Sequence, residues 1–113
     1  MLTIQTRTVN TVTILELSGH IIIGSGDAIL REGVRDCLEQ NRNRILLNLA
    51  AVKTIDESGV GELVNAYTTT VNRGGKLKLL NLPPKIQDIL TITKLIMVFE
   101  TYADEEEAVE SFG

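Results

Sequence analysis

The sequence has 113 residues, which suits a single domain, and its 43% hydrophobic and 23% charged residues are ordinary for a globular protein. No apolar stretch approaches the ~20 residues that cross a bilayer, so direct membrane insertion is not expected. The net charge of −4 comes from the segment Asp104–Glu110; the remainder carries ten acidic against eleven basic residues, without the basic surface that nucleic-acid binding needs.

Cysteine usage and the N-terminal residues indicate the cellular compartment. Cys37 is the only cysteine, which excludes an internal disulfide and is typical of a reducing environment. The first residues lack the basic head and the continuous apolar run of a signal peptide. We therefore expect a cytoplasmic protein.

The chain opens with two alternating segments rich in β-branched residues, Thr3–Thr8 and Val12–Ser18. The polar break Val9–Thr11 between them predicts a hairpin, and Ser18–His20 is expected to end its second strand. The next residues, Ile21–Gly26, favour an apolar loop over a further strand. Whether the isoleucines of this loop belong to the core or to an exposed interface stays open at this point.

The first predicted helix runs from about Asp27 to Asn41. Its apolar residues recur at a helical spacing that places them on one buried stripe, and Ser25 or Asp27 can cap its start. The stripe consists of Leu30, Val34, Cys37 and Leu38. The following run, Arg44–Leu49, is almost continuously apolar and predicts a central strand covered on both faces.

A second helix is predicted from about Ser58 to Arg73, and Gly74-Gly75 provides its stop. Its buried stripe is predicted to consist of Val60, Leu63, Val64, Tyr67 and Val71. Lys76–Leu82 predicts the next strand, and Pro83-Pro84 opens a third helix. The residues of this helix expected to face inward are Ile86, Ile89 and Leu90.

The C-terminal region predicts a short strand around Met97–Thr101 and a final acidic helix, because Asp104 and Glu107 have the spacing of a capping box. The chain is therefore expected to form a single α/β domain, residues 1–113. Alternating strands and helices predict parallel βαβ units, to which the hairpin adds an antiparallel strand. We expect a mixed β-sheet of about four to five strands with about four helices; their division between the two faces is not determined.

Residues suited to catalysis are few. His20 is the only histidine and directly follows a predicted strand, so we interpret it as a polar loop residue. Cys37 lies on the apolar stripe of the first helix, which favours a buried structural thiol. The consecutive Glu105, Glu106 and Glu107 cannot all face one ion, and the glycine pairs lack the lysine of a phosphate-binding loop. We expect no enzyme activity, no metal and no cofactor.

The segment Ile55–Gly61, here called the signature turn, follows a buried strand at the edge of the sheet where open α/β folds place their binding sites. Asp56 can cap the second helix, and Glu57 suits the positive end of the helix dipole. Neither role requires Gly59 and Gly61, each of which costs up to ~1 kcal/mol of helix propensity. Local reasoning allows a structural role for the glycines; their position suggests instead that something approaches the backbone closely.

The run Ile55-Asp56-x-Ser58-Gly59-Val60-Gly61, after the strand Ile45–Leu49, resembles the signature of STAS domains. It is most similar to the bacterial anti-sigma-factor antagonists of sporulation and stress-response pathways. The resemblance covers nearly the whole chain, including the segment Gly74–Asn81, the Phe99 strand and the acidic helix. It implies that the signature turn binds a partner through Asp56, Glu57, Ser58, Gly59, Val60 and Gly61.

The resemblance also implies a mechanism of partner switching. An antagonist of this family binds an anti-sigma factor, which is also a serine kinase, and thereby frees the sigma factor. The kinase phosphorylates the antagonist at the start of the second helix, and a phosphatase reverses the reaction. A phosphate there would add about −1.5 to −2 charge beside a close protein contact, so the switch would act on the interface.

This sequence departs from the family pattern at the acceptor position, which is occupied by Glu57. Three hypotheses follow: the protein binds a partner adapted to Glu57 without phosphorylation, Glu57 acts as a constant phosphate mimic that prevents tight binding, or Ser58 or Thr54 has become the acceptor. We rank them in that order. Ser58 corresponds to the second hydroxyl residue of the motif, which is not the usual acceptor.

Two further features of the resemblance stay open. The loop Ile22, Ile23, Gly24 and Ser25 could add an exposed apolar surface beside the signature turn. STAS domains also serve as accessory subunits of membrane lipid or anion transport systems, which is the alternative function. Both a monomer and a homodimer are compatible with the sequence.

Overall fold

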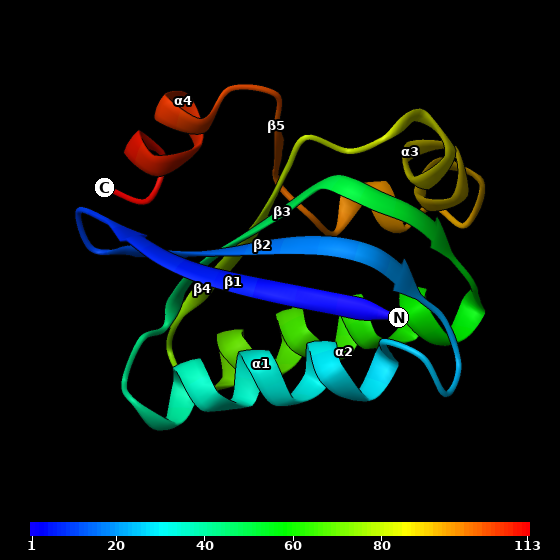
Figure 1. Cartoon of the computed structure of the whole chain (residues 1–113). Coiled ribbons are helices and arrows are strands. Elements are labelled where there is room, and N and C mark those ends of the chain that lie inside the picture. The colour runs from blue at the N-terminus through cyan, green and yellow to red at the C-terminus, as the bar shows by residue number, and fades with distance from the viewer.

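A five-stranded mixed sheet forms the centre of the computed structural model, which describes residues 1–113 (Figure 1). The order of strands and helices is the predicted one. The elements are β1 (Leu2–Val9), β2 (Val12–Ile21), α1 (Asp27–Glu39), β3 (Arg44–Ile55), α2 (Glu57–Asn72), β4 (Lys76–Leu80), α3 (Pro84–Ile92), the 3₁₀ turn η1 (Leu95–Met97), β5 (Thr101–Tyr102) and α4 (Glu105–Glu110).

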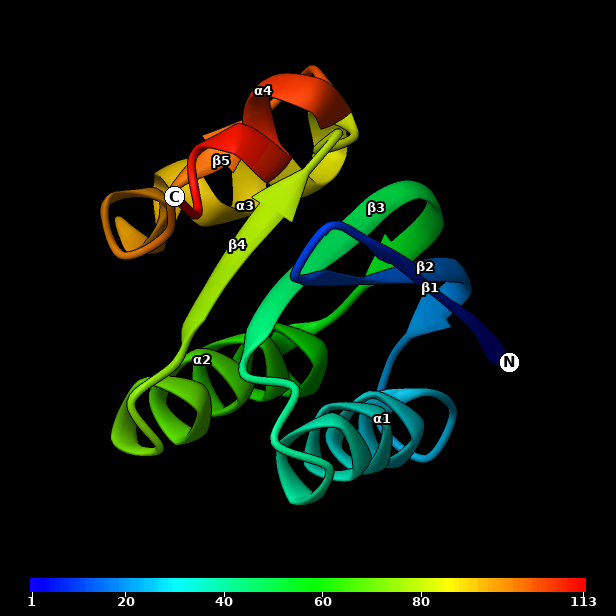
Figure 2. The same cartoon turned by 90° about the vertical axis from the view of Figure 1, so that its left-hand side faces the viewer.

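The strands lie in the sheet in their order along the chain, β1-β2-β3-β4-β5. β1 is antiparallel to β2, while the β2–β3, β3–β4 and β4–β5 pairs are parallel. Helices α1 and α2 cover one face, whereas α4 lies on the other (Figure 2). The carboxyl ends of the parallel strands therefore meet at one edge, where the loops that precede α1 and α2 begin.

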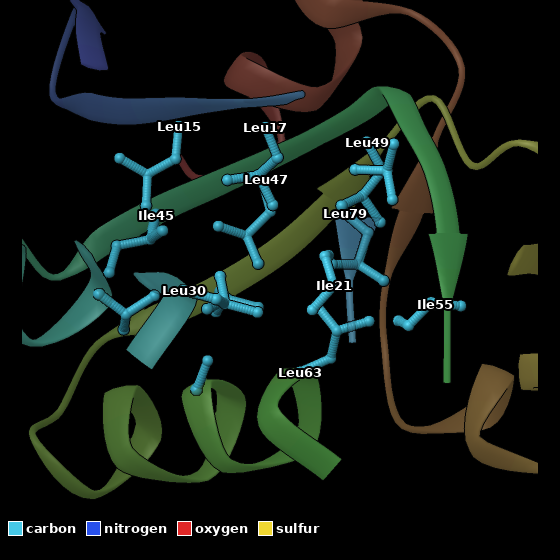
Figure 3. Close-up of a cluster of buried hydrophobic side chains, with 14 of the residues drawn as sticks. Leu15, Leu17, Ile21, Leu30, Ile45, Leu47, Leu49, Ile55, Leu63 and Leu79 are labelled. Atoms are coloured by element: carbon cyan, nitrogen blue, oxygen red, sulfur yellow. The ribbon is translucent and has the colours of Figure 1, made fainter. Parts of the chain in front are cut away.

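Two apolar clusters lie on opposite faces of the sheet. The larger one fills the space between the sheet and helices α1 and α2, and Ile45, Leu47 and Leu49 of β3 belong to it (Figure 3). Leu46, which lies between Ile45 and Leu47 in the sequence, belongs to the smaller cluster under α4. This alternation confirms that β3 is covered on both faces, which explains why its sequence is apolar at consecutive positions.

The predicted extents of β2, β3 and the last strand are wrong. β3, predicted over Arg44–Leu49, continues to Ile55. β2 continues through Ser18–His20 to Ile21, because Gly19 adopts a φ of 115° and the pairing with β3 shifts register there, so the strand bends without ending. The strand expected at Met97–Thr101 is the turn η1 followed by the two-residue β5. Leu95 and Ile96 pack against the larger cluster as part of this turn, which draws the chain out of an extended path.

The helix stripes agree with the sequence in α1 and differ from it in α2. In α1 the four predicted residues are buried; Gly26 takes the N-cap position, and the Asp27 carboxylate accepts the N–H of Ala28 in the first turn at 2.8 Å. In α2, Val71 is 45% exposed while Thr70 is fully buried. The Thr70 hydroxyl donates to the carbonyl of Ala66 at 2.8 Å, so its burial leaves no unpaired polar group.

Helix α4 is fastened to the sheet by polar contacts around its apolar face. Its predicted cap is confirmed: the Asp104 carboxylate accepts the N–H of Glu107 at 3.2 Å. Lys78 is 3% exposed, and its Nζ donates to the carbonyl and the hydroxyl of Ser111 at 3.0 and 2.9 Å. Arg7 forms an ion pair with Glu105 at the other end of the helix.

The corrected α2 stripe can be tested with two adjacent substitutions. Thr70→Lys should lower the free energy of unfolding by more than about 3 kcal/mol, because it buries an unpaired charge. Val71→Lys should change it by less than about 0.5 kcal/mol, because the side chain is already half exposed. Urea unfolding followed by circular dichroism measures both values. Similar values for the two variants would contradict the assignment.

Candidate functional site

The signature turn is held in place by one carboxylate that bonds to two separate segments. Asp56 is the N-cap of α2, and its Oδ1 accepts the N–H of Gly59 at 2.9 Å, as the sequence predicted for a cap. Its Oδ2 accepts the N–H of Ile23 at 3.0 Å, which the sequence did not indicate. The bonds from Ile23 and Gly59 hold the pKa of the Asp56 carboxyl below its usual range. The candidate loop Ile22–Ser25 is thus tied to the start of α2.

The two candidate acceptor hydroxyls are both engaged within the fold. The half-buried Ser58 donates its Oγ–H to Oδ2 of Asp27 at 3.1 Å, which links the starts of α2 and α1. Thr54 Oγ1 lies 2.6 Å from Nδ1 of His20. His20 lies within β2, so its interpretation as a loop residue is wrong. Glu57, in contrast, is exposed and takes part in none of the ion pairs.

The two glycines of the turn have different surroundings. A Cβ on Gly59 would lie 2.0 Å from the carbonyl oxygen of Ile21 and 2.6 Å from Cγ1 of Ile55, so the helix can approach the ends of β2 and β3 only with glycine here. A Cβ on Gly61 would meet nothing within 4 Å. Internal packing thus explains Gly59, and only Gly61 leaves open surface.

Apolar residues are exposed around the turn. Ile21 is fully buried, Ile22 is half-buried and Ile23 is 74% exposed, so the loop belongs partly to the core and partly to the surface. Ile21 and Ile55, the last residues of β2 and β3, belong to the larger apolar cluster (Figure 3).

An open depression of about 510 Å³ lies beside Glu57, between the start of α2 and the end of α3. Its lining comprises Ile55, Asp56, Glu57, Val60, Ile89 and Thr93. The sequence did not place Ile89 and Thr93 at this site, because they belong to α3 and its C-cap, about thirty residues further along the chain. Ile92, between them in sequence, is 80% exposed.

The remaining reactive groups of the chain do not converge. No group of three or more His, Cys, Asp or Glu side chains is placed to hold a metal ion. Cys37 is buried, and burial raises the pKa of its thiol. No helix combines the length and the apolar character needed to cross a membrane. The signature turn therefore combines the unpaired Glu57 carboxylate with neighbouring exposed apolar side chains.

The family model of the STAS domain matches residues 3–108. The chain belongs to the STAS-domain family. Its five-stranded mixed sheet with four helices is the fold of solved structures in that family. The signature turn occupies the start of α2 in this STAS domain.

Individual relatives agree with the family assignment. A Thermotoga neapolitana protein provisionally named an anti-sigma factor antagonist is 32% identical over 73 residues, and the match spans 65% of this chain and 65% of that protein's length. A crystal structure of a Thermotoga maritima protein with the same provisional name is 26% identical, with a TM-score of 0.89 over 96% of this chain and 93% of that one. The phosphorylated form of the Bacillus cell fate determinant SpoIIAA shares the fold, with 22% identity and a TM-score of 0.74 over 96% of this chain and 98% of its own.

The contrast between the two glycines leads to a matched pair of substitutions. Gly59→Ala should destabilise the protein by about 2 kcal/mol or more, because the new methyl group overlaps the Ile21 carbonyl. Gly61→Ala should stabilise it by roughly 0.5–1 kcal/mol, because alanine is the better helix former and has space here. Thermal unfolding of both variants measures the difference. A destabilised Gly61→Ala protein would mean that the surface at this position is not open.

The Asp56 hydrogen bonds predict a pH dependence. Because the folded pKa lies below the unfolded one, the stability that the ionised carboxylate provides is fully present above about pH 4 and is lost as the pH falls through the folded pKa. Asp56→Asn should therefore be less stable than the wild type at pH 7, and this difference should shrink below about pH 4. Urea unfolding from pH 3 to 7 measures it, with Asp88→Asn on α3 as an exposed control. A difference that does not depend on pH would contradict this account.

Proposed function

We propose that this STAS domain is a cytoplasmic, non-catalytic regulator of the anti-sigma-factor antagonist type that acts by partner switching. The observation that carries the proposal is the arrangement at the start of α2, where Glu57 faces solvent and the Ser58 hydroxyl is bonded to Asp27. The provisional names of two relatives from Thermotoga support the same class. The partner would be an anti-sigma factor of the serine-kinase type.

The contacts of Ser58 favour a version of this function without phosphorylation. A phosphate on Ser58 would bring about −1.5 to −2 charge next to the carboxylate of Asp27. In the unmodified protein this carboxylate accepts a hydrogen bond from the Ser58 hydroxyl. The modification would break a bond between two helices and add a repulsion. Glu57 already supplies one constant negative charge at the positive end of α2, without either cost. A phosphatase would have a role only if Ser58 or Thr54 were the acceptor.

The surface proposed to meet the partner combines this charge with apolar side chains. Ile23 lies on the loop bonded to Asp56, and the depression between α2 and α3 is lined in part by Val60 and Ile89. Exposed apolar side chains bordered by charged groups are typical of a protein interface, in which a polar rim surrounds an apolar core. Gly61 leaves space for the partner to approach the first turn of α2. Binding here would occupy the anti-sigma factor and release the sigma factor.

The role of Glu57 can be tested by capture from the native organism. The wild-type protein and Glu57→Ser are used as baits side by side, and bound proteins are identified by mass spectrometry. We expect the wild type to capture an anti-sigma factor and Glu57→Ser to bind it roughly tenfold more weakly, because the partner's matching charge is left unpaired. Tighter binding of Glu57→Ser would establish Glu57 as a phosphate mimic instead. Capture of a membrane permease would favour the transport alternative.

Incubation of the protein with the captured kinase and ATP, followed by intact-mass measurement, tests the acceptor. No added phosphate is expected, because both neighbouring hydroxyls are engaged in hydrogen bonds. Ser58→Ala serves as the control for any modification that is seen. A single phosphate that appears on the wild type and not on Ser58→Ala would overturn the phosphorylation-independent proposal.

A further inference from the structure

Strand β1 leaves one side of the sheet without a partner, because it pairs only with β2 (Figures 1 and 2). The carbonyl of Met1 accepts the N–H of His20 at 3.1 Å, and the register continues without a shift along the strand. In an antiparallel pair the backbone bonds alternate, so the N–H and C=O groups of Ile4, Thr6 and Thr8 point away from β2. Ile4 is half-buried and the two threonines are exposed, so the edge is open over residues 4–8.

This edge lacks the features that normally keep other strands away. β1 contains no proline, no lysine and no bulge, and most of its residues are β-branched. Its single charge is Arg7, whose Nε donates to Glu16 at 2.7 Å and whose guanidinium also pairs with Glu105 of α4. Arg7 is therefore directed across the face that carries α4 and does not guard the edge.

A hollow of about 460 Å³ lies beneath the edge, between β1 and α1. Apolar atoms of Ile4, Ile29 and Cys37 line part of it. Its charged residues are Glu32, Asp36 and Arg42, two acidic against one basic, and none of them takes part in an ion pair. An extended chain added to β1 would place alternate side chains over this hollow.

We propose that residues 4–8 of β1 are a docking edge for an extended segment of a partner protein that carries apolar and basic side chains. The partner's backbone would bond to the free groups of Ile4, Thr6 and Thr8. On the side that faces α1, an apolar side chain would enter the hollow beside Ile4 and Ile29. A lysine or arginine two residues away, on the same face of the added strand, would lie near Glu32 and Asp36.

A second copy of this chain fits the edge less well than a foreign basic strand. The side chains of its own β1 that would face α1 are uncharged, since Ile4 and Thr6 line the hollow and Arg7 lies on the opposite face. A two-fold pairing would also bring Glu32 and Asp36 of both copies towards one another across the axis. Like charges placed together disfavour such a pair.

Amide hydrogen exchange measured by NMR tests the proposal directly. The probes are two synthetic nonapeptides with threonine at the odd positions; at the even positions valine alternates with lysine in one peptide and with glutamate in the other, so that valine and the charged side chain share one face. The lysine peptide should slow exchange of the Ile4, Thr6 and Thr8 amides by at least about tenfold, while the Thr3, Gln5 and Arg7 amides, which already bond to β2, change little. The glutamate peptide should have no effect at the same concentration.

Three variants separate the backbone from the charge contribution. Thr6→Pro removes one outward N–H and should abolish the protection of the Ile4 and Thr8 amides. The variant should still fold, because proline is tolerated on edge strands. The double variant Glu32→Gln/Asp36→Asn keeps the edge and should weaken binding of the lysine peptide by roughly three- to tenfold. Glu106→Gln/Glu110→Gln removes two exposed acidic groups of α4 instead, and should leave the affinity unchanged.

Several results would overturn the proposal. These are absence of protection by millimolar lysine peptide, equal protection by the glutamate peptide, and equal weakening by the α4 double variant. Sedimentation that shows a dimer with the Ile4, Thr6 and Thr8 amides protected without peptide would identify a second copy as the occupant, and would also overturn it. Because this edge is separate from the signature turn, Glu57→Ser should leave peptide binding unchanged, so the two proposals fail independently.

Discussion

The arrangement of the signature turn depends on the carboxylate of Asp56. One of its oxygens satisfies a free N–H at the start of α2, and the other holds the N–H of Ile23 in the loop that precedes α1. Two segments about thirty residues apart thereby share a single anion. The positive end of the α2 dipole and the two N–H donors favour the ionised form, and the ionised form is the one that keeps both bonds. The positions of Ile23 and Glu57 at the surface follow from this contact.

The close approach of α2 to the sheet places the neighbouring side chains. With glycine at position 59, the first turn of the helix rests against the Ile21 carbonyl, and the Ser58 hydroxyl reaches Asp27 of α1. The next residue back, Glu57, then faces solvent. In the proposed function, Glu57 supplies a constant carboxylate where the family pattern places a phosphorylated hydroxyl, while the Ser58 hydroxyl bonds within the fold. The same geometry explains why we favour a partner that binds the constant negative charge of Glu57.

The two faces and the two edges of the sheet are finished in different ways. Helices α1 and α2 close one face over the larger cluster, and α4 covers part of the other through Lys78 and Arg7. At the β5 edge the last strand is only two residues long, which limits pairing with another chain. β1, at the opposite edge, is eight residues long and uninterrupted. The difference makes β1 the side of the sheet at which a strand can be added.

The sequence by itself determined the order of elements, the mixed sheet, the α1 stripe and the Asp56 cap, because each depends on short-range periodicity or on contacts within one helical turn. Only the tertiary structure decided the rest. In the folded chain β2 continues past Gly19, and Thr70 instead of Val71 is buried in the core. Ile89 of α3 and its C-cap Thr93 lie beside the signature turn. The tertiary structure also assigned Gly59 to internal packing and left Gly61 open. These outcomes depend on which distant backbone or side chain lies opposite each residue, and the spacing of residues along the chain carries no information about that.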